Sequence, residues 1–417
     1  MRDCLVMLTK TFPFDKGEEF IENELPVLAE KFEHVFLIAT STADNAVQTR
    51  QVPQNVTVYH IPASQVKRYL PGAAARLLFS PSMHGFIERD ELKQAHAKLK
   101  SWAFFYYFIA KSEVLFSICR RILLAHRMKA YDGITFYAYW FYDVAVVANQ
   151  LKKYCPAQTS KAVCRAHGYD LYQERQPSGF LPLRPYLLKN LDAVYPCSEN
   201  GTRYILQHWP AGKGKVHTAY LGTRDYGLGP VPREDCFHIV SCCHISPVKR
   251  VELLAQALSL LQGSGLKLKW THIGDGDTLK ELRNFAKEHL AFMETDLRGA
   301  LPNQQLMSFY QSTPVSLFVN TSSSEGLPVS IMEASSFGIP SIATDVGGTS
   351  ELIRTGETGQ LLPADLTPEA LAKAIWDAAS QSAEKMAAQR KACRAVWEQS
   401  FQADKNFAAF AENILPF

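Results

Sequence analysis

The sequence predicts an α/β protein made of two Rossmann-like β/α/β domains in series. Short apolar runs of strand length alternate with segments whose apolar residues recur at helical spacing, and this alternation begins twice within the 417 residues. Between the two series, the segment 220–235 is rich in Gly and Pro. We therefore expect an N-terminal domain over 1–222, a second domain over 223–400 and a final helical segment over 401–417.

The first series begins with a short buried strand at 5–8, a loop, and a helix whose apolar residues recur between Phe20 and Phe32. A second strand at 34–40 completes the start of a βαβ unit, which implies a parallel sheet. Residues 91–131 are predicted to be mostly helical. The remaining elements expected in this half are strands at 133–138, 161–165, 193–196 and 216–221 and a helix over 144–151.

The second series shows the same alternation. Its clearest helix start is Thr367-Pro368-Glu369, where Thr367 suits the N-cap and Pro368 the first helical position. An amphipathic helix is expected over 402–417. The other expected elements are strands at 237–243, 268–273, 315–320 and 341–343, and helices over 248–261, from Thr278, and from Pro328 to Gly338.

The charge and the cysteines exclude several classes of protein. The 44 basic and 41 acidic side chains leave a net charge of +3, too small to indicate a nucleic-acid partner. Nine cysteines without CxxC spacing argue against a disulfide framework and against a zinc site. With no apolar run of signal-peptide or membrane-spanning length, we expect a cytoplasmic protein.

The charge is unevenly distributed. Residues 1–220 carry 27 basic and 19 acidic side chains, whereas residues 221–417 carry 17 and 22. The first half also contains the stretch 98–129, in which Trp and Tyr are flanked by Lys and Arg. This composition suits an interface with anionic lipid, although a buried helix in the core would explain the run 102–109 equally well.

The segment 321–353 carries the most specific pattern. Its predicted strand ends in serines that include Ser324, and Glu325-Gly326-Leu327-Pro328 then opens a helix. Gly326 allows a ligand to approach the backbone, and the free N–H groups at the helix start favour an anion such as a diphosphate.

Two carboxylates in this segment can bracket a long ligand. Glu325 precedes the helix and Glu333 lies within it, eight positions later. Carboxylates accept hydrogen bonds from paired hydroxyls, which suits a sugar at one end and a ribose at the other. The plainer alternative is that Glu325 caps the helix and Glu333 is solvated.

The segment Glu325-GLPVSIM-Glu333, followed by Gly338 and a Gly-Gly loop, resembles the signature of the retaining glycosyltransferases of family 4. That resemblance implies the GT-B architecture, with two domains facing a central cleft and a C-terminal helix crossing back to the N-terminal domain. It also implies that Glu325 lies at the donor sugar, that Gly326 and Leu327 meet the sugar and diphosphate, and that Glu333 holds the ribose.

The same resemblance extends to five further donor-binding residues and a second catalytic residue. Lys249 matches the family lysine at the diphosphate; His244 stands where the family has Arg, and Arg250 either replaces that charge or is a surface side chain. His167 follows a predicted strand in an Arg-x-His-Gly segment and would reach the transferred sugar. Gly17 is expected near the diphosphate, with a plain turn glycine as the alternative. Gly274 and Leu301 are expected at the nucleotide base.

The resemblance predicts transfer of a hexose from a UDP- or GDP-sugar to a hydroxyl of a glycan or lipid-linked saccharide, as in surface polysaccharide biosynthesis. No metal or other cofactor is expected, since the helix start, Lys249 and Arg250 can stabilise the departing diphosphate. If residues 98–129 contact anionic lipid, the protein would work at the inner face of the cytoplasmic membrane.

Three other functions remain open. The chain would also suit a non-catalytic subunit that binds sugar nucleotides, because His244 departs from the family pattern. A GT-B phosphorylase or an epimerase would share the fold. A dehydrogenase is disfavoured, because no GxGxxG follows the first strand.

Overall fold

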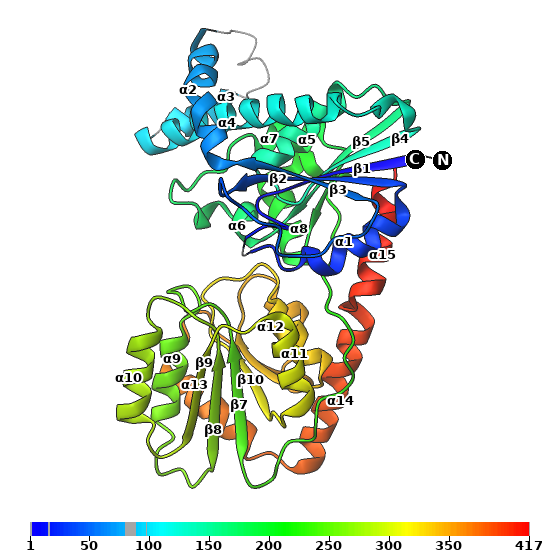
Figure 1. Ribbon diagram of the computed structural model, residues 1–417. Coiled ribbons are helices and arrows are strands. Elements are labelled where there is room, and N and C mark those ends of the chain that lie inside the picture. Colours follow the sequence, from blue (N-terminus) through cyan, green and yellow to red (C-terminus); the bar gives the residue numbers. More distant parts are fainter. Residues whose placement is uncertain (1, 16, 80–88, 97, 417) are drawn as a thin grey trace. The chain divides into compact units, whose positions relative to one another are not determined.

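The computed structural model describes residues 2–15, 17–79, 89–96 and 98–416, which form two compact units (Figure 1). Unit 1 combines Met1–Tyr220 with Asp404–Phe417, and unit 2 is Leu221–Ala403. Each unit is a parallel six-stranded sheet covered by helices on both faces, as the sequence predicts for Rossmann-like domains.

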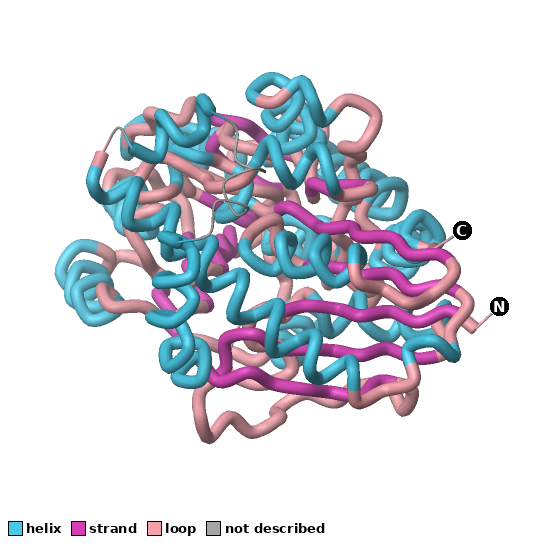
Figure 2. Tube along the Cα trace, turned by 90° about the horizontal axis from the view of Figure 1, so that it is seen from above, coloured by secondary structure: helices cyan, strands magenta, loops and turns pink. Residues whose placement is uncertain are grey.

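The sheet of unit 1 has the strand order β3-β2-β1-β4-β5-β6, and every neighbouring pair is parallel. Figure 2 shows strands running side by side with helices across them. The strands are β1 (Asp3–Thr9), β2 (His34–Thr42), β3 (Val56–Pro62), β4 (Gly133–Ala138), β5 (Thr159–Ala166) and β6 (Ala193–Pro196).

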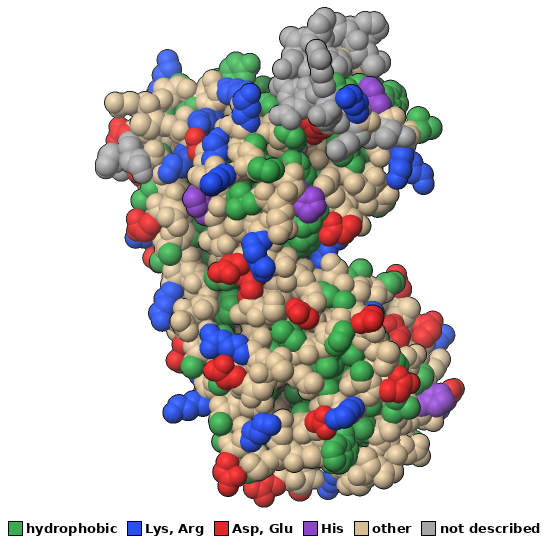
Figure 3. Space-filling view, turned by 180° about the vertical axis from the view of Figure 1, so that it is seen from behind, with side chains coloured by type: hydrophobic (Ala, Val, Ile, Leu, Met, Phe, Trp, Pro, Cys, Tyr) green, Lys and Arg blue, Asp and Glu red, His purple; other side chains and the backbone are tan. Residues whose placement is uncertain are grey.

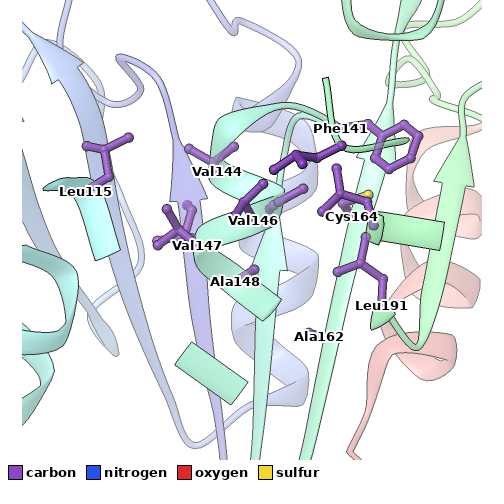
Figure 4. Close-up of a cluster of buried hydrophobic side chains, with 14 of the residues drawn as sticks. Leu115, Phe141, Val144, Val146, Val147, Ala148, Ala162, Cys164 and Leu191 are labelled. Atoms are coloured by element: carbon purple, nitrogen blue, oxygen red, sulfur yellow. The ribbon is translucent and has the colours of Figure 1, made fainter. Parts of the chain in front are cut away.

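The two faces of this sheet pack against different helices because side chains alternate along each strand. Along β1, Val6 and Leu8 point into a core shared with α2, α4 and α5, whereas Leu5 and Met7 point toward α1 and the C-terminal helix. Figure 4 shows part of the first core around α5. The helices are α1 (Ile21–Lys31), α2 (Ala63–Phe79), α3 (Arg89–His96), α4 (Leu99–Leu124), α5 (Asp143–Lys153), α6 (Gly168–Leu171), α7 (Arg184–Asn190) and α8 (Glu199–His208).

The C-terminal helix α15 (Ala403–Ile414) packs on the sheet of unit 1, which confirms the predicted return to the N-terminal domain. Its Phe410 ring lies over the guanidinium of Arg165, at 3.9 Å. Arg165 is fully buried and forms an ion pair of 3.0 Å with Glu24 of α1, which is also fully buried. Lys31 of α1 and Glu412 of α15 form a second, exposed ion pair.

Helix α4, which forms most of the stretch 98–129, belongs to the core along one side only. Phe105 and Phe108 are buried, whereas Trp102 is 41% and Tyr107 47% exposed. Lys111 forms an ion pair of 2.6 Å with the buried Asp143, so this lysine is not free to meet lipid. Within the described ranges α4 alone has the length and apolarity of a membrane span, and nearly half of its most apolar window is buried.

The sheet of unit 2 has the order β12-β11-β10-β7-β8-β9, again with parallel neighbours. Its strands are β7 (Phe237–Cys242), β8 (Leu268–Ile273), β9 (Glu294–Gly299), β10 (Leu317–Asn320), β11 (Ser341–Thr344) and β12 (Gly359–Leu362). Its helices are α9 (Val251–Ser259), α10 (Leu279–His289), α11 (Asn303–Ser312), α12 (Val329–Ser336), α13 (Pro368–Ala379) and α14 (Ala383–Ser400).

Two sequence-based expectations were wrong. Residues 216–221 do not form a strand of the sheet, and Val216 makes only an isolated bridge to Val194. The helix expected from 248 begins only at Val251, because Arg250 has a left-handed backbone with φ of 48°. By contrast, Thr367 and Pro368 begin α13 as predicted.

Candidate active site

The candidate donor site lies where β10 and β7 end in unit 2. Glu325, in the loop between β10 and α12, is 8% exposed. Its Oε1 accepts hydrogen bonds from Lys249 Nζ at 2.7 Å and from Asn320 Nδ2 at 3.2 Å. The structure therefore brings together the two predicted residues Glu325 and Lys249, which come from different loops. In this pairing the lysine charge is balanced by the carboxylate.

A glycine loop fixes the backbone of this site. Gly348 N–H donates to the carbonyl of Gly326 at 2.9 Å. Gly347 has φ of 57°, and a Cβ atom there would lie 1.9 Å from the carbonyl oxygen of Glu325. Only glycine fits this approach. Beside it Leu327 is buried, Ser324 is half-buried, and α12 begins at Val329, so the positive end of the helix dipole lies here.

Glu333 lies one turn into α12 and is 8% exposed. Its Oε1 accepts a hydrogen bond of 2.8 Å from Asn303 Nδ2, at the start of α11. Burial raises the pKa of Glu333 to about 7, because the charged form has lost most of its water. Further hydrogen-bond donors, such as the hydroxyls of a ribose, would stabilise the charged form of this buried carboxylate.

The predicted base-binding segments lie next to each other beside the edge strand β9. Gly274 N–H donates to the carbonyl of Gly299 at 2.8 Å, and a Cβ on Gly274 would lie 1.8 Å from the carbonyl oxygen of Cys243. Leu301 is half-buried and follows β9, two residues before Asn303. Asn303 was missed from the sequence, since a lone Asn at a helix start reads as an ordinary cap.

Arg250 is held by backbone carbonyls. Its guanidinium donates to Thr321 O at 2.7 Å, Ala364 O at 3.0 Å and Ser322 O at 3.3 Å. It therefore braces the loop after β10, a role that neither alternative from the sequence included. Its contact with a diphosphate remains a prediction.

In unit 1, His167 directly follows β5 and is 8% exposed. Its Nε2 lies 3.2 Å from the carbonyl oxygen of Tyr139, and its ring lies 5.0 Å from that of Trp140. Burial, together with Arg165, lowers the pKa of His167 to about 3, so the imidazole is neutral at pH 7. A neutral ring whose Nε2–H donates to Tyr139 can contact a sugar hydroxyl without adding charge.

Glu18 organises the loop after β1 and was not predicted. Its carboxylate accepts hydrogen bonds from the backbone N–H groups of Lys10, Thr11 and Phe12 at 2.7–2.9 Å. It also accepts one from Trp140 Nε1 at 2.5 Å. The only sequence signal was its position after Gly17, which has φ of 101° and therefore a conformation that favours glycine.

Aromatic side chains surround the ammonium of Lys10 at the same edge of the sheet. Lys10 Nζ lies 4.5 Å from the ring centroid of Trp140, 4.8 Å from that of Tyr169 and 5.5 Å from that of Tyr142. Trp140 and Tyr142 come from the loop after β4, and Tyr169, which is 47% exposed, comes from α6, directly after β5. Aromatic faces with a nearby cation suit the binding of a saccharide that bears hydroxyls or an anionic group.

Two large cavities among the described residues lie elsewhere. One of about 600 Å³ in unit 1 is lined by the end of α4, and one of about 900 Å³ in unit 2 by α14 and residues 228–237. We place the candidate site at the carboxyl ends of the strands, because ligands of parallel α/β sheets bind there. In the described part of the chain no cluster of three His, Cys, Asp or Glu side chains could hold a metal, and metal independence remains a prediction.

Solved structures of other proteins share this fold. Anabaena HepE in complex with UDP and glucose superposes with a TM-score of 0.63 at 16% identity over 98% of both chains. The lipopolysaccharide outer core galactosyltransferase WaaB superposes with a TM-score of 0.63 at 14% identity, over 98% of this chain and 99% of WaaB. These likenesses establish the GT-B fold.

Sequence comparisons match part of the chain to a family of glycosyltransferases. Residues 231–395 match the family described as Glycosyl transferases group 1. The O-antigen biosynthesis glycosyltransferase WbnH of Escherichia coli is 35% identical over 201 residues, 46% of this chain and 54% of WbnH. The amylovoran biosynthesis glycosyltransferase AmsK of Erwinia amylovora is 24% identical over 250 residues, 58% of this chain and 60% of AmsK. The chain spans about half the length of the curated relatives it matches.

The chain therefore has the GT-B fold, and its residues 231–395 match the group 1 glycosyltransferase family, in agreement with the fold and the family predicted from the sequence.

Proposed function

We propose that this protein is a retaining glycosyltransferase that moves a hexose from a UDP-sugar to a hydroxyl of a saccharide in polysaccharide biosynthesis. The observation that carries the proposal is the pairing of Glu325 with Lys249, together with the buried Glu333 in the following helix, all within the segment that matches the family. The UDP-glucose complex of HepE and the biosynthetic roles in the names of WbnH and AmsK support the donor and the pathway class.

Each residue at the site has a proposed part in the transfer. The bond from the anomeric carbon to the diphosphate breaks, a bond to the acceptor oxygen forms on the same face, and the acceptor proton passes to the departing phosphate oxygen. Lys249 and the start of α12 stabilise the charge that develops on the diphosphate. Glu325 and His167 position the hexose, and Glu333 holds the ribose. Arg250 keeps the loop after β10 in place.

In unit 1 we propose that the acceptor saccharide lies against Trp140 and Tyr169, beside Lys10. A lipid-linked acceptor would bring the exposed Trp102 and Tyr107 of α4 to an anionic membrane. Flotation with acidic liposomes tests this contact. We expect Trp102→Ala with Tyr107→Ala to reduce binding several-fold, and equal binding of both proteins would contradict the membrane contact.

The test of the function is donor binding and turnover. We expect UDP-glucose or another UDP-hexose to raise the melting temperature, and to be slowly hydrolysed when no acceptor is present. Glu325→Gln and His167→Ala should reduce hydrolysis at least 100-fold, whereas Glu281→Gln, on the exposed side of α10, should leave it unchanged. A chain that binds no nucleotide sugar would refute the proposal.

A non-catalytic subunit that binds sugar nucleotides is the second candidate. The observation that favours it is His244, which is exposed at the position where the family has Arg. In that case UDP-sugars would bind and Glu333→Ala would weaken binding, but no acceptor or water would release UDP. Release of UDP that depends on Glu325 would exclude this function.

A further inference from the structure

An apolar cavity of about 600 Å³ lies in unit 1, at the amino-terminal edge of its sheet. Its floor contains Ile134 and Phe136 from the start of β4 and Leu151 from α5, all of them buried. The candidate residues His167 and Glu18 lie at the opposite edge, where β1, β4 and β5 end. The cavity is thus separate from the proposed site of sugar transfer, and its size is within the range of ligand-binding pockets.

The rim of this cavity is positively charged. Arg120, Arg127 and Lys129 line it, and the lining contains no Asp or Glu. All three are exposed, and within the described ranges none of them forms an ion pair; Arg120 lies over the ring of Tyr154 at 5.1 Å. The helix dipole alone would favour basic side chains near the C-terminal end of α4. It does not explain why an apolar cavity lies beneath these side chains.

The apolar surface continues outward from the cavity. Leu124, the last residue of α4, is 72% exposed, and Tyr154 is 63% exposed, and both line the cavity. On the face of the molecule in Figure 3, Lys and Arg side chains of unit 1 stand among apolar ones. An apolar floor below a cationic rim matches a molecule with an apolar tail and an anionic head.

We propose that this cavity binds a single-chain anionic amphiphile, with its hydrocarbon chain on the apolar floor and its phosphate or carboxylate head at Arg120, Arg127 and Lys129. The chain gains from leaving water, at about 0.8 kcal/mol for each buried CH₂. The head gains charge-assisted hydrogen bonds from guanidinium and ammonium groups that lack a carboxylate partner. This inference does not depend on the proposed sugar transfer.

Calorimetric titration with dodecyl phosphate below its micelle concentration tests the proposal. We expect one molecule to bind per chain. The charge-reversal variant Arg127→Glu with Lys129→Glu should weaken binding at least tenfold, whereas Lys189→Glu with Arg203→Glu, two exposed basic residues elsewhere on unit 1, should change it less than twofold. Ala130→Trp, at an exposed position in the lining, should fill the cavity and abolish binding.

Three outcomes would overturn the proposal. Unchanged affinity in the charge-reversal variant would show that the rim does not recognise the head. Inorganic phosphate that binds as tightly as dodecyl phosphate would reveal an anion site without a chain, and decyltrimethylammonium that binds equally well would reveal an apolar site without charge selection. If Ala130→Trp does not fold, Leu124→Glu places a carboxylate at an exposed rim position and should weaken binding at least tenfold.

Discussion

The buried carboxylate of Glu333 should make the free protein less stable as the pH rises. Burial raises its pKa from the ordinary value of 4.5 to about 7, and Asn303 offsets only part of this effect. The folded chain therefore keeps a proton that the unfolded chain has released, so the free energy of unfolding falls between about pH 4.5 and pH 7. At 1.36 kcal/mol for each pKa unit, the loss is about 3 kcal/mol above pH 8.

The variant Glu333→Gln keeps the shape of the side chain and removes the charge. Urea unfolding from pH 5 to pH 8 should show equal or slightly lower stability of the variant at pH 5. By pH 8 the variant should be more stable than the wild-type chain by about 3 kcal/mol. Glu281→Gln, where the carboxylate is exposed, is the matched control and should follow the wild type throughout.

The same substitution should have the opposite effect on the donor. A ribose hydroxyl donates to a charged carboxylate more strongly than to an amide, so Glu333→Gln should weaken UDP binding about tenfold at pH 8. A wild-type stability that does not fall relative to the variant between pH 5 and pH 8 would refute the reasoning about burial. Unchanged UDP affinity would refute the ribose contact alone.

Three other substitutions test the packing of each unit. Gly347→Ala would force a Cβ into the carbonyl of Glu325, and calorimetry should show UDP binding weakened at least tenfold; affinity within twofold would contradict the close approach. Glu24→Gln leaves the buried guanidinium of Arg165 without its ion partner and should cost about 3–5 kcal/mol of unfolding free energy in urea, whereas a loss below 1 kcal/mol would show that water reaches Arg165. Thr367→Ala removes the N-cap of α13 and should cost about 1 kcal/mol in the same assay, with Thr367→Ser as the control that keeps the hydroxyl.

The central strands could be predicted from the sequence, and three of the edge strands could not. Residues 133–138 and 268–273 form strands with the predicted bounds, and both strands are buried over almost their whole length. The missed strands β3, β9 and β12 lie at sheet edges and carry mixed polar sequences, of which 294–299 (ETDLRG) is the clearest example. An edge strand is paired on one side only and needs no continuous apolar run.

The candidate site shows the same limit. The pattern of Glu325 and Glu333 could be read from the sequence because both lie on one loop-helix segment. The partners that hold them, Asn320 and Asn303, are ordinary polar residues whose roles depend on the folded chain. For Arg250, the sequence predicted a surface or ligand-binding charge, but its guanidinium donates hydrogen bonds to neighbouring backbone carbonyls. Spacing along the chain predicts such motifs, but it does not predict which groups form hydrogen bonds with each other in the folded protein.

The return of α15 to unit 1 has a consequence for the order in which the chain can fold during synthesis. Unit 2 is one continuous segment, Leu221–Ala403, and can complete its own core as soon as it has left the ribosome. Unit 1 must wait, because Phe410 and Ile414 fill one face of its sheet and are made after all of unit 2. Until then Tyr137 and Tyr195, whose rings pack against Phe410 in the finished protein, stay uncovered on that face of the sheet.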